Sequence, residues 1–238
     1  WDHSEYLGNS LEKILREKMG VLRSGVPVIS GLAEPDLRNS LVKECERLAC
    51  PLFFSDSISR KVVQKSWNGQ EVLIDGQSFF LRNPSIGALE NAATAYLFLR
   101  KVFPEIEIST LQSAFRSMVN PGRFEIVQEN PRIVLSGDHN VAGMRTLTET
   151  LYELKAKNLF VLCGFSPDKE ASQMIEALRP FSKELLLTRV PRARGIYDET
   201  YQKLANYEDD PFEAFEQLKK KLSSSDTLLV TGSLYLVG

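Results

Sequence analysis

Both histidines of this sequence directly follow an aspartate, in two pairs far apart along the chain. The pairs are Asp2-His3 in WDHSEYLG and Asp138-His139 in SGDHN, and the 238 residues contain no third histidine. Imidazole exchanges protons near neutral pH, and its neutral form is a common metal ligand. Two such pairs could act on a single reaction, provided that the fold brings them together. For His3 alone, the sequence leaves a metal ligand and a surface loop residue open.

His139 lies where an apolar run turns into a helical pattern. Residues 132–136 read as a strand and residues 141–154 as a helix, so Asn140 is the expected N-cap. The unpaired backbone N–H groups at such a helix start suit a phosphate. Three interpretations of Asp138 remain open: it orients His139, it approaches a metal-bound phosphate, or it is an ordinary turn residue.

Lys18 is the residue whose position least fits its charge. In the amphipathic pattern of residues 9–22 it falls in the middle of the apolar arc that contains Leu11, Ile14 and Leu22. A lysine there either extends its ammonium group to solvent or meets a compensating partner. Burial of an amine disfavours its charged form, and a neutral amine can act as a base or nucleophile or take up carbon dioxide to form a carbamate.

Arginines occur at two places where an anion could bind. Arg123 lies in NPGRFE, at a break between the two halves of the sequence, where its guanidinium group could reach phosphate oxygens or pair with Glu125. The loop TRVPRARG carries three more, and it suits either an acidic substrate or plain solvated surface. These three are Arg189, Arg192 and Arg194.

The composition excludes several classes of protein. The net charge is −2, so the chain has no overall positive field for nucleic acid or an anionic membrane. No run is long enough to span a membrane, and three cysteines without a C-x-x-C pair indicate neither a disulfide framework nor a zinc site. A cytoplasmic protein is therefore expected. Neither G-x-G-x-x-G nor G-x-x-x-x-G-K-[ST] occurs, so the chain lacks a phosphate-binding loop of its own.

The first half of the sequence alternates helices with short strands. Residues 9–22 and 34–49 read as helices, and VPVIS and PLFF as strands. Asn68-Gly69 and Asp75-Gly76 then mark two tight hairpins, which predict a small antiparallel sheet. Helices are expected next, over 86–102 and 109–118.

The second half repeats strand and helix, which is typical of a parallel sheet covered on both faces. Strands are expected in RIVLSG, NLFVLCG, ELLLTRV and DTLLVTGS, with a hairpin strand in FEIVQENPRIVL, and helices over 141–154, 168–178 and 198–220. The fold class is therefore α/β, with a first domain over residues 1–119 and a Rossmann-like second domain over 120–238. Ligands of such sheets bind beyond the carboxyl ends of the strands.

Six stretches, taken in order, resemble the folylpolyglutamate and dihydrofolate synthases, which are related to the Mur ligases. They are WDHSEYLG with EKMGV and GVPVIS, GALENAATAYLFLR, NPGRFEIV, IVLSGDHNVAGM, SPDKE and VTGSLYLVG, and they cover nearly the whole chain. The resemblance implies the C-terminal part of a central ATPase domain of the Mur ligase type, followed by a Rossmann-like ligase domain. It also implies that the P-loop region precedes Trp1 in a longer enzyme, and that this piece alone is inactive.

The activity implied by the resemblance is the ATP-dependent ligation of L-glutamate to dihydropteroate, a folate or both. The acceptor carboxylate would attack the γ-phosphate of ATP, and the amine of glutamate would displace phosphate from the acyl phosphate. Mg²⁺ neutralises the developing charge in such transfers. His3 and a carbamylated Lys18 would hold a second Mg²⁺.

The remaining site residues also follow from the resemblance. Asn91 and Arg123 would contact ATP, with Arg123 on its phosphates. Asp138 and His139 would act from the second domain on the same nucleotide, and Ser233 would lie near the incoming glutamate. The two Asp-His pairs would then line one cleft. A monomer without nucleic-acid or membrane partners is expected.

The sequence also departs from the family pattern. The pattern D-G-A-H-N is replaced by Ser136-Gly137-Asp138-His139-Asn140, so a carboxylate has moved by two residues. The pattern H-Q becomes Leu89-Glu90, and D-K-D becomes Asp168-Lys169-Glu170. Two alternatives therefore remain: another Mur-type amino-acid ligase of cell-wall synthesis, or a non-catalytic nucleotide-binding or interaction module that kept the fold and lost the site.

Overall fold

The computed structural model describes residues 11–166, 170–191 and 197–238, which fall into two units that alternate along the chain. The first unit consists of the described residues up to Gln64, of Gln70–Leu81 and of Gly87–Ser117. The second unit consists of Lys65–Gly69, Arg82–Ile86 and Met118–Gly238. The expected domains, residues 1–119 and 120–238, stay a prediction.

The first unit begins with a helical pair and a pair of short parallel strands. These elements are α2 (Leu11–Met19), β1 (Val28–Ser30), α3 (Pro35–Arg47), β2 (Leu52–Phe54) and the 3₁₀ turn η1 (Ser55–Ser57). Strands β1 and β2 pair in parallel, with Val28 opposite Leu52, so the expected βαβ order is confirmed. Pro35 starts α3, where the missing N–H costs no helical hydrogen bond.

A three-stranded sheet and two helices complete the first unit. The elements are β3 (Arg60–Ser66), β4 (Gly69–Ile74), β5 (Gln77–Leu81), α4 (Ile86–Val102) and α5 (Ile108–Ser117), with the strands in the order β3-β4-β5. Asp75 and Gly76 both have positive φ, as a two-residue hairpin turn requires. One face of the sheet packs on the helices through a core that includes Ile74, Phe79 and Tyr96.

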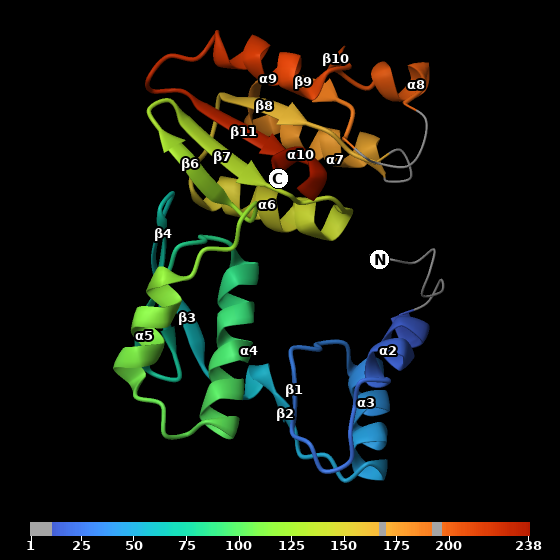
Figure 1. The fold of residues 1–238 in the computed structure, drawn as a ribbon, viewed down its shortest axis with the longest axis vertical. Coiled ribbons are helices and arrows are strands. Elements are labelled where there is room, and N and C mark those ends of the chain that lie inside the picture. Colours follow the sequence, from blue (N-terminus) through green and yellow to red (C-terminus); the bar gives the residue numbers. More distant parts are fainter. Residues whose placement is uncertain (1–10, 167–169, 192–196) are drawn as a thin grey trace. The chain divides into compact units, whose positions relative to one another are not determined.

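The second unit is built on a six-stranded sheet in the order β10-β9-β8-β11-β7-β6 (Figure 1). Its strands are β6 (Glu125–Glu129), β7 (Arg132–Ser136), β8 (Leu159–Cys163), β9 (Ser182–Thr188), β10 (Asn206–Glu208) and β11 (Thr227–Thr231). All neighbours are parallel except β6, which pairs antiparallel with β7 at one edge. The predicted α/β class, with a small antiparallel sheet and a mostly parallel one, is confirmed.

Helices cover both faces of this sheet, as the apolar strands predict. Helices α6 (Val141–Glu153) and α7 (Ala171–Leu178) pack on one face, and α9 (Pro211–Lys219) packs on the other. Alternate residues of β8 serve the two cores: Val161 belongs to the first and Leu162 to the second. Three shorter elements lie at the ends of strands. They are η2 (Arg179–Phe181), α8 (Glu199–Gln202) and α10 (Leu234–Val237).

The predicted helix over residues 198–220 is wrong. The structure divides this range into α8, the short strand β10 and α9. Pro211 disfavours helical backbone at the residue before it, and the Asp210 carboxylate caps the new helix by accepting hydrogen bonds from Phe212 N at 2.8 Å and Glu213 N at 3.1 Å. The interruption leaves room for a sixth strand.

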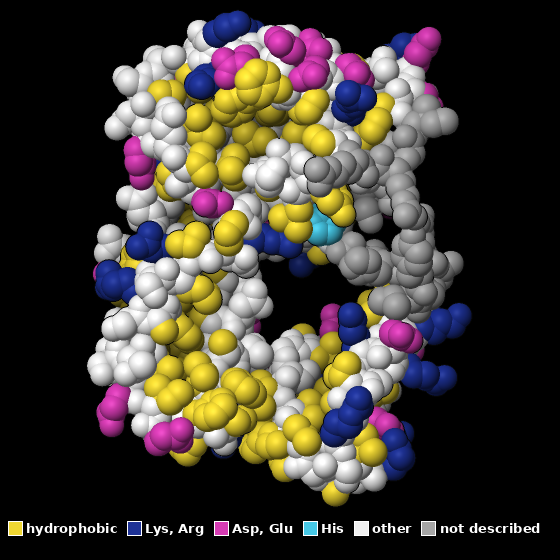
Figure 2. Space-filling view, in the orientation of Figure 1, with side chains coloured by type: hydrophobic (Ala, Val, Ile, Leu, Met, Phe, Trp, Pro, Cys, Tyr) yellow, Lys and Arg dark blue, Asp and Glu magenta, His cyan; other side chains and the backbone are white. Residues whose placement is uncertain are grey.

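The molecular surface mixes charges of both signs. On the face shown in Figure 2, basic and acidic side chains are interspersed, in keeping with the net charge of −2. Among the described residues, none of the helices has both the length and the apolar character that a bilayer crossing requires.

Candidate functional site

The candidate site lies at the carboxyl edge of the parallel sheet in the second unit. Strands β7, β8, β9 and β11 are neighbours, and each is followed by a loop in which the sequence predicts ligand-binding residues. Parallel strands end at the same edge of a sheet, so these loops are brought together by topology alone. Residues 136–140, 164–166, 189–191 and 231–233 are the described parts of this edge.

A tight turn places the Asp138 carboxylate beside the end of β7. Ser136 Oγ donates to Asp138 Oδ2 at 2.6 Å, and Asp138 N donates to Ser136 O at 2.8 Å. Burial raises the pKa of the Asp138 carboxyl, against the opposing effects of the Ser136 hydrogen bond and of the charges of Arg123 and His139. The carboxylate that the family pattern has at position 136 stands at position 138 in this sequence, where it accepts a hydrogen bond from Ser136.

His139 uses a backbone oxygen to orient its ring. Its Nδ1 lies 3.1 Å from Gly137 O, and since a carbonyl oxygen only accepts, Nδ1 carries a proton. In the neutral ring, Nε2 is then the acceptor, the form in which imidazole binds metals or takes up a proton. The Asp138 carboxylate bonds to Ser136 instead, so the interpretation in which Asp138 orients His139 has no support in this contact.

The start of α6 is capped from within the loop. Asn140 Oδ1 accepts from Gly143 N at 2.8 Å, which confirms the expected N-cap. A Cβ at Gly143 would lie 3.0 Å from Asp138 Oδ1, so the Asp138 carboxylate rests against the first helical turn. The protein's own carboxylate therefore fills part of the space that the sequence predicted for a phosphate.

Arg123 is held at the same loop by its backbone and its side chain. Its Nη1 donates to Gly137 O at 3.4 Å, and its own carbonyl oxygen accepts from Asn83 Nδ2 at 2.9 Å. Glu125 was the alternative partner for the guanidinium group, but its carboxylate accepts from Gly122 N at 2.8 Å. The Arg123 side chain is therefore directed at residues 137–139, and Glu125, its possible ion-pair partner, bonds to Gly122 N instead.

Ser233 lies at the adjacent strand end but has a structural task there. It is buried, and its Oγ accepts from Tyr235 N at 3.1 Å to cap the short helix α10. The preceding Gly232 has φ +103°, a conformation that L side chains rarely adopt. A contact of Ser233 with glutamate stays a prediction.

Lys18 is exposed, although the sequence places it in the middle of an apolar arc. The cluster under α2 is reached by Met19 and Leu22, and the side chain of Met19 lies about 100° further round the helix than that of Lys18. The packed face is thus turned away from Lys18. Of the two alternatives for this residue, the structure favours the one in which its ammonium group extends to solvent.

The other predicted site residues have different surroundings or lie outside the described residues. Asn91 is exposed on α4 of the first unit, and Arg189 pairs with Asp209 at 3.5 Å. The remaining candidates lie outside the described residues. They are His3, Arg192 and Arg194, together with Asp168 and Lys169 of the D-K-D position.

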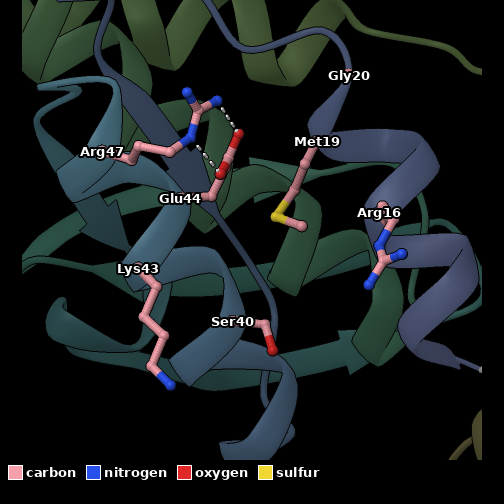
Figure 3. A pocket seen from close by; sticks show the side chains of 7 residues that line it. All are labelled: Arg16, Met19, Gly20, Ser40, Lys43, Glu44 and Arg47. Carbon is pink, nitrogen blue, oxygen red and sulfur yellow. Dashed lines mark hydrogen bonds and ion pairs between the residues drawn. The ribbon is translucent and has the colours of Figure 1, made fainter.

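A separate cavity of about 520 Å³ lies between α2 and α3 in the first unit (Figure 3). Arg16 and Lys43 line it, and a bidentate ion pair joins Arg47 to Glu44 at one side, with oxygen–nitrogen distances of 2.6 and 2.9 Å. None of the predicted site residues lines this cavity, so it lies apart from the candidate site.

Three hydrogen-bonding residues that support the site were not predicted from the sequence. Asn83 holds the Arg123 backbone, Thr231 Oγ1 donates to Ser136 O at 2.7 Å, and the Tyr201 hydroxyl joins two strand ends. Their partners lie between 13 and 95 residues away in sequence. Only the threonine gave a local signal, because a polar residue at the end of an otherwise apolar strand invites a hydrogen-bond partner.

The raised pKa of Asp138 leads to a testable pH dependence of stability. The native state holds this proton more tightly than the unfolded chain does, so the stabilising contribution is present below the ordinary value of 3.8 and is lost as pH rises through the folded-state pKa. Asp138→Asn is therefore expected to gain stability relative to the wild type as pH rises through that window. Urea unfolding between about pH 4 and 7 measures the difference.

Asp226 provides the matched control for this measurement. Hydrogen bonds from Ser223 lower the pKa of the Asp226 carboxyl, so its contribution is present above the ordinary value and is lost as pH falls. Asp226→Asn should therefore lose stability relative to the wild type as pH rises toward the ordinary value of 3.8, the opposite sign, when the unfolding series is extended down to about pH 2. Parallel curves for Asp138→Asn and the wild type would contradict the assigned burial of that carboxylate.

Residues 122–234 match the family described as "Mur ligase, glutamate ligase domain". The matched range contains the whole parallel sheet and the loop of Arg123, Asp138 and His139. Most of the second unit is therefore similar to glutamate ligase domains of the Mur ligase type.

Over nearly its whole length the chain is homologous to folylpolyglutamate and dihydrofolate synthases. It is 27% identical to "Dihydrofolate synthase/folylpolyglutamate synthase" of Bacillus subtilis, across 99% of this chain and 59% of that protein. The E. coli FolC structure with DHPP and ADP is 26% identical, with a TM-score of 0.80, across 100% of this chain and 57% of that one. A Mycobacterium tuberculosis folylpolyglutamate synthase with ADP and AMPPCP shares the fold, with a TM-score of 0.80 at 19% identity, across 98% of this chain and 59% of that one.

The chain thus spans less than two thirds of the length of these relatives and corresponds to their C-terminal portion. The family resemblance predicted from the sequence is confirmed.

Proposed function

We propose that the natural protein containing this sequence (the whole protein) uses ATP to ligate L-glutamate to dihydropteroate, a folate or both. The observation that carries the proposal is the convergence of Arg123, Asp138 and His139 on one loop of the glutamate ligase domain. A nucleotide is the favoured ligand of this loop, since the E. coli and M. tuberculosis structures contain ADP.

The proposed reaction has two bond-making steps. A carboxylate oxygen of the acceptor attacks the γ-phosphorus of ATP, and the bond to ADP breaks. The amine nitrogen of glutamate then attacks the acyl carbon, inorganic phosphate leaves, and the amine gives up a proton. Negative charge develops on the phosphate oxygens in the first step, so fixed positive groups around them lower its barrier.

This chain's residues supply such groups. The Arg123 guanidinium group carries its charge at every working pH and offers several donors to phosphate oxygens. His139, with Nδ1 donating to Gly137 O, presents Nε2–H as a donor whenever the ring is protonated. In this proposal Asp138 places the loop over the nucleotide, Asn91 contacts ATP from the first unit, and Ser233 lies near glutamate.

Mg²⁺ is the metal that this chemistry ordinarily requires, where it neutralises charge on the transferred phosphate. The described residues contain no group of three or more His, Cys, Asp or Glu side chains arranged to hold a metal. We assign a Mg²⁺ to His3 and to Lys18, whose exposed amine can take up carbon dioxide and so gain the oxygen ligands that Mg²⁺ prefers. Uptake of ¹³C-labelled carbon dioxide by Lys18 in the whole protein, read by NMR, tests the carbamate directly.

We also propose that the whole protein is a cytoplasmic monomer whose substrates are small molecules. The intended test compares the whole protein with the chain of residues 1–238 in a coupled ADP assay, using MgATP, L-glutamate and either dihydropteroate or a folate. ADP formation that depends on all three substrates is expected from the whole protein only.

Two other outcomes identify the alternatives. A whole protein that ignores both acceptors but joins an amino acid to a nucleotide-linked muramic acid is a cell-wall ligase. If calorimetry with AMPPCP detects no binding to the whole protein, both ligase proposals fall, and the protein is a module that kept only the fold.

A further inference from the structure

Hydrogen bonds outside the regular ladder join four neighbouring strand ends at the carboxyl edge. Thr231 Oγ1 at the end of β11 donates to Ser136 O at the end of β7, at 2.7 Å. Gly164 N, after β8, donates to Thr231 O at 3.1 Å. The Tyr201 hydroxyl accepts from Phe165 N at 2.9 Å and donates to Thr188 O of β9 at 3.1 Å. The order of these contacts follows the strand order β9-β8-β11-β7.

Tyr201 lies on α8 and joins this chain of contacts through its hydroxyl. Its side chain is buried, and its ring packs edge-on against Tyr197, with centroids 4.9 Å apart, and against Tyr207, at 6.2 Å. Burial raises the pKa of the Tyr201 hydroxyl, so the group stays protonated and can both donate and accept. Without this hydroxyl, the buried N–H of Phe165 would lose its partner, which is costly in a protein interior.

One arm of the network leads to Ser233. A Cβ at Gly232 would lie 2.3 Å from Gly164 O and 2.9 Å from Cε1 of the Phe165 ring, so the backbone at Gly232 rests directly on residues 164–165. Because interiors are close-packed, a shift of Phe165 must be transmitted to Gly232 and to the next residue, Ser233. Tyr201 thus fixes the position of Ser233 through two steps of contact.

The other arm leads to the Asp138 loop. Thr231 Oγ1 holds the carbonyl of Ser136, and the hydroxyl of Ser136 holds the Asp138 carboxylate at 2.6 Å. Arg123 and His139 both contact Gly137 O, in the same turn. Loss of the Thr231 hydroxyl would therefore release the end of β7, which is followed by Asp138 and His139 and by the Gly137 carbonyl that Arg123 contacts.

We infer that Tyr201 and Thr231 are positioning residues with separate tasks, Tyr201 for the glutamate subsite at Ser233 and Thr231 for the nucleotide subsite at Arg123, Asp138 and His139. This inference rests on the proposed function. Neither side chain touches substrate; each acts through the backbone that carries the contacting residues.

The separate tasks predict a crossed kinetic pattern in the whole protein. Tyr201→Phe is expected to raise the KM for glutamate about tenfold and to leave the KM for ATP within about twofold of the wild type. Thr231→Val, which keeps the shape and removes the hydroxyl, is expected to raise the KM for ATP about tenfold and to spare that for glutamate. Thr231→Ser restores the hydroxyl and should return the KM for ATP to near the wild-type value.

Each variant has a matched control on the same element or ring cluster. Tyr207→Phe removes a hydroxyl from a ring that packs on Tyr201, one that donates to the exposed Asp209 carboxylate at 2.8 Å. Thr227→Val alters the opposite end of β11. Neither control should change the KM for glutamate or the KM for ATP. If Tyr201→Phe and Thr231→Val each raise both KM values equally, the two residues only stabilise the fold in general, and the inference is overturned.

Hydrogen exchange tests the network without reference to activity. In Tyr201→Phe, the amides of Phe165 and of residues 232–235 should exchange about tenfold faster than in the wild type, while Tyr207→Phe leaves them unchanged. Faster exchange at Phe165 alone would overturn the inference even in an active ligase. Faster exchange at both places in a protein without ligase activity would retain the network and refute the proposed function.

Discussion

Replacing Arg123 with alanine in the whole protein is expected to lower kcat/KM for glutamate ligation by about a hundredfold to a thousandfold. The guanidinium group is a permanently charged donor at the loop of Asp138 and His139, and the Arg123 carbonyl oxygen is held by Asn83 Nδ2 at 2.9 Å. Steady-state kinetics with ATP as the varied substrate measures the loss. Arg123→Lys should recover only part of it, because an ammonium group lacks the planar fork.

Arg145→Ala is the control for Arg123→Ala. Arg145 lies on α6 of the same unit, where it is exposed and forms a helical ion pair with Glu149. Such surface pairs contribute little to stability, so this variant should keep wild-type kinetics and a nearly unchanged unfolding midpoint. Wild-type kcat/KM in Arg123→Ala would remove Arg123 from the proposed nucleotide site.

Gly232→Ala is expected to destabilise the protein by at least about 4 kcal/mol, or to prevent folding altogether. Two effects add at this position. The backbone φ of +103° is unfavourable for any L side chain, and the new Cβ would lie 2.3 Å from Gly164 O, a backbone atom that cannot move aside alone. Chemical unfolding, or the soluble yield where the variant does not fold, measures the effect.

Gly25→Ala separates the two causes. Gly25 also has positive φ, +75°, but a Cβ there would have no atom within 4 Å. Its cost should be limited to backbone strain, about 1–2 kcal/mol. Similar losses for Gly25→Ala and Gly232→Ala would show that the contact with Gly164 is not as tight as the structure places it.

The elements with strong local signals were predictable from the sequence. Hydrophobic alternation and the Asn-Gly and Asp-Gly turns specify the small sheet, and apolar runs alternating with helices specify the parallel one. The short strand β10 was missed because three residues carry too little periodicity to stand out against a helical background, whereas Asp210-Pro211 was a readable break that the prediction passed over.

The site was predictable only as far as chain topology determines it. The carboxyl edge follows from strand order, which explains why the loop at 136–140 and Ser233 come out at neighbouring strand ends. The Ser136–Asp138 hydrogen bond depends on how one turn is folded, and the contacts of Tyr201 depend on which strands become neighbours. The exposure of Lys18 has a related explanation: a helical wheel shows which residues share a face, but not which part of that face packs.

The second unit is assembled from three pieces of the chain, since Lys65–Gly69 and Arg82–Ile86 join it from far upstream. The ring of Trp67, from the first piece, packs beside the Phe124 ring, with centroids 6.0 Å apart, and under the Arg132 guanidinium group. Asn83, from the second piece, holds the Arg123 backbone. A transplant of this unit into another protein by cutting near residue 120 would therefore leave behind Trp67, which packs on Phe124, and Asn83, which holds the Arg123 backbone. A working chimaera must import the hairpin tip and the segment before α4 as well.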